Sequence, residues 1–91
     1  MTYPTILPNI GNSLAEEIDT ELSSAKRHGE SFYSLHEAYG VILEEVDEVW
    51  DVAKQKKRNR DRDALRKEFI QIAAMAIKAI HSMDSFVGGT V

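Results

Sequence analysis

One helix near the C-terminal end of this 91-residue chain has more apolar surface than a single neighbour could cover. We predict it over residues 63–83, and between Phe69 and Ile80 its only polar residues are Gln71 and Lys78. A helix on the surface of a monomer is apolar along one stripe only. This helix therefore needs neighbours on two sides, and we expect another subunit to supply the second through a twofold interface, in a homodimer or homotetramer.

Two further helices are predicted from their start signals. Ser13 with Glu16, and Ser34 with Glu37, have the spacing of a capping box, in which a serine and a glutamate satisfy free backbone N–H groups. The polar stretch after the second helix is rich in Lys and Arg and should hold a turn. The chain is thus predicted to be one all-α domain over residues 1–91, an antiparallel bundle of about three helices per chain completed by oligomerisation. Its parts are an irregular segment 1–12, helices 13–28, 34–57 and 63–83, and a tail 85–91.

The second predicted helix has the broadest apolar face. At about 100° per residue its apolar side chains share one side and should face the core. They are Leu35, Ala38, Tyr39, Ile42, Leu43, Val46, Val49, Trp50 and Ala53. The first helix has only a narrow stripe, so it covers a core more than it forms one.

Composition excludes several classes of protein. A chain this short buries only about 60–65% of its unfolded surface, and with no cysteine it has no disulfide or thiolate metal site. Association with another copy is the expected remedy. The formal net charge of −4 argues against a nucleic-acid partner. Without a signal-peptide pattern or the roughly 20 apolar residues of a membrane span, we expect a cytoplasmic protein with no membrane partner.

An acidic cluster lies in the second predicted helix. Its members fall within eight consecutive residues: Glu44, Glu45, Asp47, Glu48 and Asp51. Like charges three and four positions apart on a helix repel by roughly a few tenths of a kcal/mol per pair. Glu45 and Glu48 project side by side, and Glu45 borders the apolar face, where an unpaired charge is costly. Most acidic runs on helices are simply solvated faces, so a metal site here requires further ligands from another helix.

The third predicted helix offers such ligands. Glu68 lies at the edge of its apolar stripe, and Gln71 follows one turn later. If the second and third helices pack antiparallel, these two residues converge with Glu45 and Glu48 on one point. Such an oxygen-only set suits Mg²⁺ or Mn²⁺. The di-iron alternative requires Glu-x-x-His pairs, and no histidine here stands three residues after a glutamate.

These residues also resemble the signature of a known family. The run Glu44-Glu45-Val46-Asp47-Glu48, followed by Glu68-Phe69-Ile70-Gln71, is similar to the Glu-Glu-x-x-Glu and Glu-x-x-Asp motifs of the MazG-like, all-α nucleoside triphosphate pyrophosphohydrolases. The likeness spans roughly residues 13–84 and is to small bacterial and phage members. It implies a bundle assembled by dimerisation, in which acids bind Mg²⁺ and the metal grips the phosphates of a nucleoside triphosphate. Water would then cleave between the α and β phosphates, giving a nucleoside monophosphate and pyrophosphate.

The resemblance also implies roles for individual residues. Glu45, Glu48 and Glu68 would be metal ligands, and Glu44 would support the site or orient the attacking water, so these four are the candidate catalytic residues. Gln71 stands where the family has an aspartate and would offer the metal a neutral carbonyl oxygen. Loss of this carboxylate weakens metal affinity, and it affects the expected reaction more than the expected fold.

Other interpretations stay open. The bundle could be catalytically silent and bind a nucleotide or a protein, with Gln71 marking a repurposed site, or it could be purely an oligomerisation module. The basic connector, residues 54–63, could contact phosphates, although lysine-rich loops are usually only solvated. Asp47 or Asp51 could replace the charge that Gln71 lacks, although by helical phase Asp47 points away from the cluster.

Overall fold

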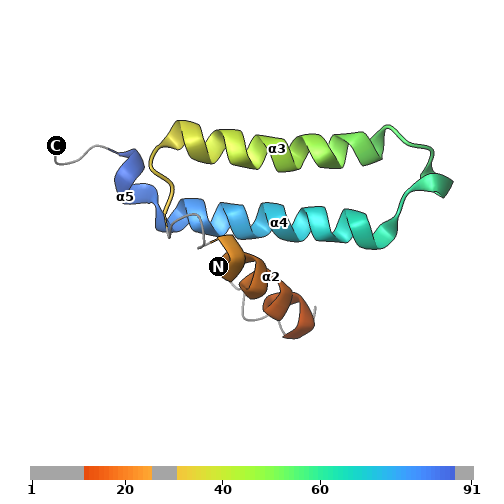
Figure 1. Ribbon diagram of the computed structural model, residues 1–91, viewed down its shortest axis with the longest axis horizontal. Helices are drawn as coiled ribbons and strands as arrows, with labels where there is room; N and C mark the ends of the chain where they lie inside the picture. Colours follow the sequence, from red (N-terminus) through yellow and green to blue (C-terminus); the bar gives the residue numbers. More distant parts are fainter. Residues whose placement is uncertain (1–11, 26–30, 88–91) are drawn as a thin grey trace.

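The computed structural model describes residues 12–25 and 31–87, and every regular element within them is helical. The elements are α2 (Asn12–Ala25), α3 (Leu35–Ala53), the 3-10 turn η2 (Lys57–Asn59), α4 (Arg62–His81) and the short α5 (Met83–Phe86). Helices α3 and α4 run antiparallel as a long hairpin, and α2 lies across α4 (Figure 1). The all-α prediction is confirmed for this part of the chain. No helix in it is both long and apolar enough to cross a membrane.

Helix α3 begins with the predicted cap. Ser34 has an extended backbone, and its Oγ accepts a hydrogen bond from the N–H of Glu37 at 3.1 Å. The Glu37 carboxylate in turn accepts from the N–H of Tyr33 at 2.7 Å. Helix α2 begins at Asn12, one residue before the predicted start, and its predicted end at residue 28 lies outside the described residues.

The connector ends one helix and begins the next. Helix α3 stops at Ala53, earlier than the predicted residue 57, and Arg60 binds carbonyls at this point. Its guanidinium donates to the carbonyl oxygen of Ala53, the last residue of the helix, at 2.8 Å and to that of Gln55, in the connector, at 3.2 Å. Helix α4 then starts at Arg62, where Asp61 caps it by accepting from the N–H groups of residues 63 and 64 at 3.0 and 3.1 Å.

Ser82 closes the other end of the hairpin. It is only 2% exposed, and its hydroxyl donates to the carbonyl of Lys78 at 2.7 Å and accepts from the N–H of Phe32 at 2.9 Å. The buried Phe32 ring lies 4.6 Å from the Lys78 ammonium. The predicted helix 63–83 is therefore divided at Ser82, and the predicted tail 85–91 begins inside α5.

Helix α4 has neighbours on two sides within its own chain. Helix α3 covers one side and α2 another, and between them they bury Ile70 and Ala74. Arg66 of α4 is paired with Glu17 of α2 across this contact. Helix α2 of the same chain is thus one of the two neighbours, while Phe69 and Ile80 of α4 remain 54% and 66% exposed.

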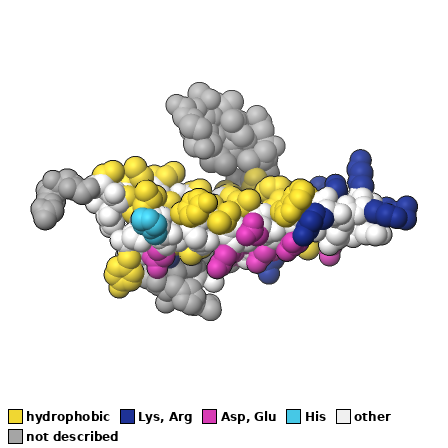
Figure 2. Space-filling view, turned by 90° about the horizontal axis from the view of Figure 1, so that it is seen from above, with side chains coloured by type: hydrophobic (Ala, Val, Ile, Leu, Met, Phe, Trp, Pro, Cys, Tyr) yellow, Lys and Arg dark blue, Asp and Glu magenta, His cyan; other side chains and the backbone are white. Residues whose placement is uncertain are grey.

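Within the described residues, helix α3 packs mainly against α4 and leaves much of its apolar face uncovered. Ala38 is buried, but a row of large side chains along the helix is exposed: Leu35, Tyr39, Leu43, Val46 and Trp50. Figure 2 shows this row of hydrophobic side chains beside a row of acidic ones. The prediction that the whole face belongs to the core is wrong for these five residues, because the α4 side of the hairpin covers only half of it.

Candidate metal centre

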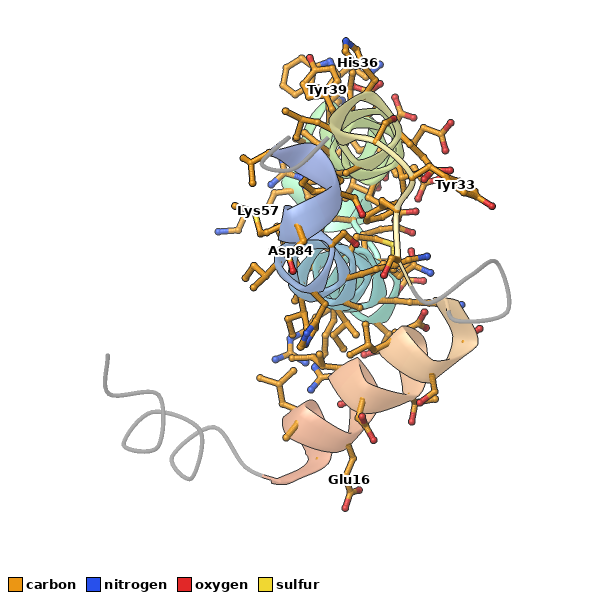
Figure 3. The ribbon with its side chains drawn as sticks, turned by 90° about the vertical axis from the view of Figure 1, so that its left-hand side faces the viewer. Glu16, Tyr33, His36, Tyr39, Lys57 and Asp84 are labelled. Carbon is orange, nitrogen blue, oxygen red and sulfur yellow. The ribbon has the colours of Figure 1, made fainter. Side chains whose placement is uncertain are left out.

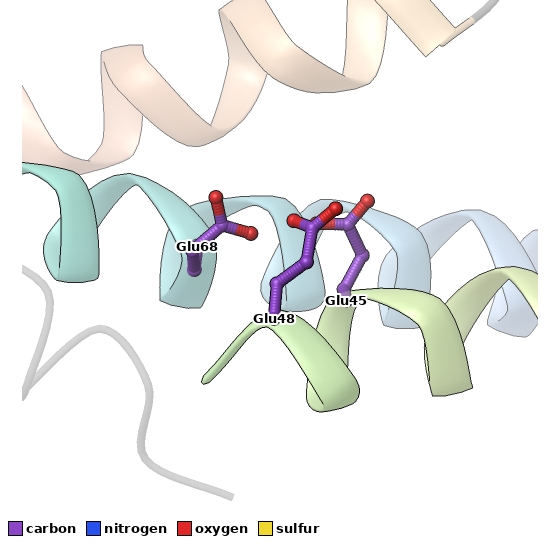
Figure 4. Close-up of side chains that lie close together, drawn as sticks. All are labelled: Glu45, Glu48 and Glu68. Carbon is purple, nitrogen blue, oxygen red and sulfur yellow. The ribbon is translucent and has the colours of Figure 1, made fainter. Parts of the chain in front are cut away.

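The hairpin brings three glutamates together near its middle. Glu45 and Glu48 extend from α3, and Glu68 extends toward them from α4 (Figure 4). One carboxylate oxygen from each lies within 4.8 Å of the other two. Glu48 is exposed, whereas Glu45 and Glu68 are half-buried between the helices. These are the three glutamates that the sequence places on facing sides of an antiparallel pair.

Burial and the neighbouring carboxylates raise the pKa of two members of the cluster, Glu45 and Glu48. Burial raises the pKa of Glu45 above its ordinary value of 4.5, and the charges of Glu48 and Glu44 add to the increase, whereas its hydrogen bond with Glu68 opposes it. The pKa of Glu48 is raised by a hydrogen-bonding contact with Glu68 and by the charge of that residue. Three acids at this spacing therefore carry an electrostatic cost that a bound cation or a proton would relieve.

Gln71 is the fourth member of the cluster. When its amide is assigned from the hydrogen-bond network, the nitrogen faces the acids and donates to Oε2 of Glu45 at 2.7 Å and to Oε2 of Glu68 at 3.2 Å. It therefore bridges a carboxylate of α3 and one of α4. In this orientation Gln71 donates hydrogen bonds to the acids, and its carbonyl oxygen points away from them. To bind a metal through that oxygen, the amide group would have to rotate so that its nitrogen and oxygen exchange places.

The neighbouring acids of α3 stand outside the cluster. Glu44 is exposed and reaches Glu45 only through its charge. Asp51 is paired with Lys54 at 3.1 Å, and Asp47 is exposed on the solvent side of the helix. Neither aspartate replaces the carboxylate that Gln71 lacks.

The donor set fits one hard cation. Mg²⁺ holds oxygen ligands at about 2.1 Å, so two ligands of one ion are at most ~4.2 Å apart. Since the three oxygens already lie within 4.8 Å of one another, small side-chain rotations would close the difference. Ligands of this kind, without nitrogen or sulfur, favour Mg²⁺ or Mn²⁺ over zinc or copper.

A groove of about 550 Å³ lies between α2 and α4. Lys67 and Arg66 lie on its α4 wall and Glu16, Glu17 and Glu21 on its α2 wall. Lys67 stands one helical turn before Gln71, although neither Gln71 nor the three clustered glutamates line the groove. It is open and mixed in charge, with both basic and acidic groups available to a polar molecule.

Comparison of the chain with protein-family models, with curated proteins and with solved structures finds no match. The carboxylate cluster and its surroundings are therefore the features from which a function can be argued.

Two contacts that hold the site's helices in place have no signal in the sequence. The Arg66–Glu17 pair and the Phe32–Ser82 hydrogen bond join residues 49 and 50 positions apart. Local spacing rules act over three or four residues and cannot find such partners. The buried position of Ser82 next to α5 is visible only once the helices are packed.

Proposed function

We propose that this chain is a metal-dependent nucleoside triphosphate pyrophosphohydrolase that uses Mg²⁺ or Mn²⁺ at the Glu45–Glu48–Glu68 cluster. The observation that carries the proposal is the approach of these three carboxylates, from two helices, to within 4.8 Å of one another. Their similarity in spacing to the MazG-like signature supplies the reaction class.

The local electrostatics support metal binding. Like charges at this separation are unfavourable, and the raised pKa values of Glu45 and Glu48 report that cost. The α3–α4 hairpin nevertheless holds them together, and an arrangement that is costly for the folded chain alone is typical of a binding site.

Each residue then has a chemical role. Glu45, Glu48 and Glu68 would hold the metal, which neutralises phosphate charge and acidifies a water. Glu44, exposed one position before Glu45, would accept a proton from that water or orient it. Oxygen of the water bonds to the α phosphorus as the bond to the bridging oxygen breaks, and pyrophosphate leaves. The α2–α4 groove, which shares helix α4 with the cluster, would accommodate the nucleoside.

The test is pyrophosphate release from a panel of nucleoside triphosphates with Mg²⁺ or Mn²⁺. We expect release by the wild type, loss of at least about 100-fold in Glu68→Gln, and near-normal release in Asp47→Asn. Asp47→Asn removes one negative charge from the same helix outside the cluster, so it controls for the change in net charge. Equal activity in all three proteins would refute the site assignment.

A second candidate is a catalytically silent bundle that binds a nucleotide or a protein. The Gln71 amide favours it, because its nitrogen already relieves repulsion between Glu45 and Glu68 without a metal. This candidate predicts that nucleotides raise the melting temperature without turnover, since a ligand that binds only the folded state stabilises it. Turnover that depends on Glu68 would rule it out.

A further inference from the structure

A second groove between α2 and α4 is lined mainly by apolar side chains, and we call it the apolar groove. Its volume is about 490 Å³, within the range of about 300–1,000 Å³ that is typical of binding pockets. In Figure 3, α2 lies on the opposite side of α4 from α3, and α3 takes no part in this groove. Two of its apolar wall residues come from α2 and four from α4: Leu14, Ile18, Leu65, Phe69, Ile70 and Ala73.

The walls of the apolar groove are in contact with water over much of their surface. Phe69 is 54% exposed, and Leu14 and Ile18 are only half-buried. Single exposed apolar side chains are ordinary on protein surfaces, whereas apolar side chains gathered in one groove are typical of a binding site. Since the six apolar walls offer no hydrogen-bonding side chain, the occupant that fits them is itself apolar along most of its length.

The part of the chain directly before α2 has that composition. Residues 1–15 contain no Asp, Glu, Lys, Arg or His, which makes them the longest uncharged run of a sequence in which 29% of residues are charged. Segments that stay solvated are usually rich in charge and poor in large apolar residues. Residues 1–11, which lie outside the described residues, include five large apolar side chains: Met1, Tyr3, Ile6, Leu7 and Ile10. We call residues 1–11 the 1–11 segment.

Its point of attachment brings the 1–11 segment next to the apolar groove. The segment joins α2 at Asn12, and Leu14, a wall residue of the groove, follows two positions later. A short tether gives the attached group an effective concentration of about millimolar at a neighbouring site. A separate protein present at micromolar concentration would need much higher intrinsic affinity to compete with it. The covalent link therefore favours this segment over a foreign partner.

The 1–11 segment is also long enough to fill the apolar groove. On α4 the groove extends from Arg62 to Ala73, eleven steps of about 1.5 Å, or about 17 Å. Pro4 and Pro8 disfavour a helix and favour extended backbone in the residues that precede them. An extended chain covers about 3.3 Å per residue, so about five or six residues span this distance. The stretch from Tyr3 to Ile10 provides eight.

We propose that residues 1–11 dock in the apolar groove of their own chain as an extended segment, with their apolar side chains against Phe69 and its neighbours. Docking adds a second attachment between α2 and α4 beside the Arg66–Glu17 pair. Arg66 and Ile70 line both this groove and the α2–α4 groove described above, so the docked segment also supports a wall of the other groove. The proposal does not depend on hydrolysis, because none of the clustered carboxylates takes part in it.

A double-mutant cycle in the full chain tests the docking. Changing Ile6, Leu7 and Ile10 together to serine should raise the unfolding equilibrium constant at least about 10-fold, because apolar side chains lose their buried site. In a Phe69→Ala background the same triple change should have a clearly smaller effect, since contacting residues are not additive. Ile80→Ala is the matched control, because Ile80 is a 66% exposed apolar residue of α4 that does not line the groove. No effect of the triple change, or equal effects in both backgrounds, would overturn the proposal.

Cysteine cross-linking locates the segment independently of stability. Because the chain has no cysteine, each introduced pair of thiols is unique. Phe69→Cys combined with Ile6→Cys, Leu7→Cys or Ile10→Cys should give a disulfide within one chain for at least one pair, since a disulfide requires Cα atoms about 5.5 Å apart. The same three thiols combined with Ile80→Cys should give none. Absence of a link to Phe69→Cys, or links only between different chains on denaturing gels, would show that the segment does not occupy its own groove.

Discussion

The side-chain amide nitrogen of Gln71 lies 2.7 Å from Oε2 of Glu45, and this hydrogen bond joins α4 to α3 at the point where their carboxylates meet. The same nitrogen also reaches Glu68, so one neutral side chain offsets part of the repulsion between two acids. Any cation that binds here competes with that amide. A substitution at Gln71 is therefore expected to change the stability of the metal-free chain and its metal affinity in opposite directions.

Gln71→Asp should have opposite effects with and without metal. Without metal it adds a fourth acid and removes the donor to Glu45, so the melting temperature should fall; with Mg²⁺ the new carboxylate should raise metal affinity by about 10-fold. Calorimetric titration and melting with and without a chelator measure both. Gln55→Asp makes the same chemical change in the connector and should leave metal affinity unchanged. Unaltered metal binding in Gln71→Asp would place this residue outside the site.

Glu45→Gln should stabilise the metal-free chain at neutral pH. The pKa of Glu45 is raised on folding, so the folded state binds more protons than the unfolded state just above the ordinary value of 4.5. Its favourable contribution is therefore present at low pH and lost as pH rises through the folded pKa. Unfolding by denaturant in chelator should show the advantage of the variant shrinking toward acidic pH, with Asp47→Asn as control. An advantage independent of pH would contradict this cause.

The Arg66–Glu17 pair should contribute modestly to the docking of α2 on α4. Both side chains are partly exposed, at 39% and 45%, so the expected coupling is about 0.5 kcal/mol. A double-mutant cycle with Arg66→Gln and Glu17→Gln, followed by denaturant unfolding, isolates it. The exposed Lys54–Asp51 pair at the C-terminal end of α3 provides the comparison and should couple less. Zero coupling for Arg66 would mean that apolar contacts alone hold α2.

Ser82→Ala should destabilise the folded chain. It leaves the N–H of Phe32 without its partner inside the protein, which costs about 1–3 kcal/mol in the free energy of unfolding. Ser85→Ala, an exposed serine in α5, is the matched control and should change the free energy by less than about 0.5 kcal/mol. Equal effects from the two substitutions would show that the Phe32 N–H finds another acceptor.

Gly40→Ala should stabilise the chain by about 0.5–1 kcal/mol. Gly40 lies inside α3, and a Cβ added there meets no atom within 4 Å, so the substitution brings the entropic gain without a clash. Ala76→Gly, at an exposed position of α4, should cost a similar amount and serves as the reverse control. Destabilisation by Gly40→Ala in a denaturant titration would show that another group occupies that space.

The structural features predicted best from the sequence were those that depend on residues a few positions apart in the chain. The cap of α3 depends on Ser34 and Glu37, three positions apart, and it forms as expected. The approach of Glu68 to Glu45 and Glu48 follows from helical phase and a short connector. The exposure of Leu35 and Trp50 could not be foreseen, because periodicity shows which residues share a face but not how many neighbours cover that face.

The role of Gln71 illustrates a second limit of the sequence. Its position predicts membership of the cluster, and it lies there. An amide can donate through its nitrogen or accept through its oxygen, and only the surrounding carboxylates select between them. The predicted carbonyl ligand and the amide donor to Glu45, assigned from the hydrogen-bond network, are two orientations of one side chain.

Arg60 and Ser82 anchor opposite ends of the hairpin, and together they determine how far one helix can slide along the other. A slip by one turn would move α4 by about 5.4 Å and carry Glu68 past its partners on α3. Such a slip requires Ser82 to release Phe32 at one end and Arg60 to release the carbonyl of Ala53 at the other. The axial alignment of the carboxylates is therefore maintained from a distance, by two contacts that never touch them.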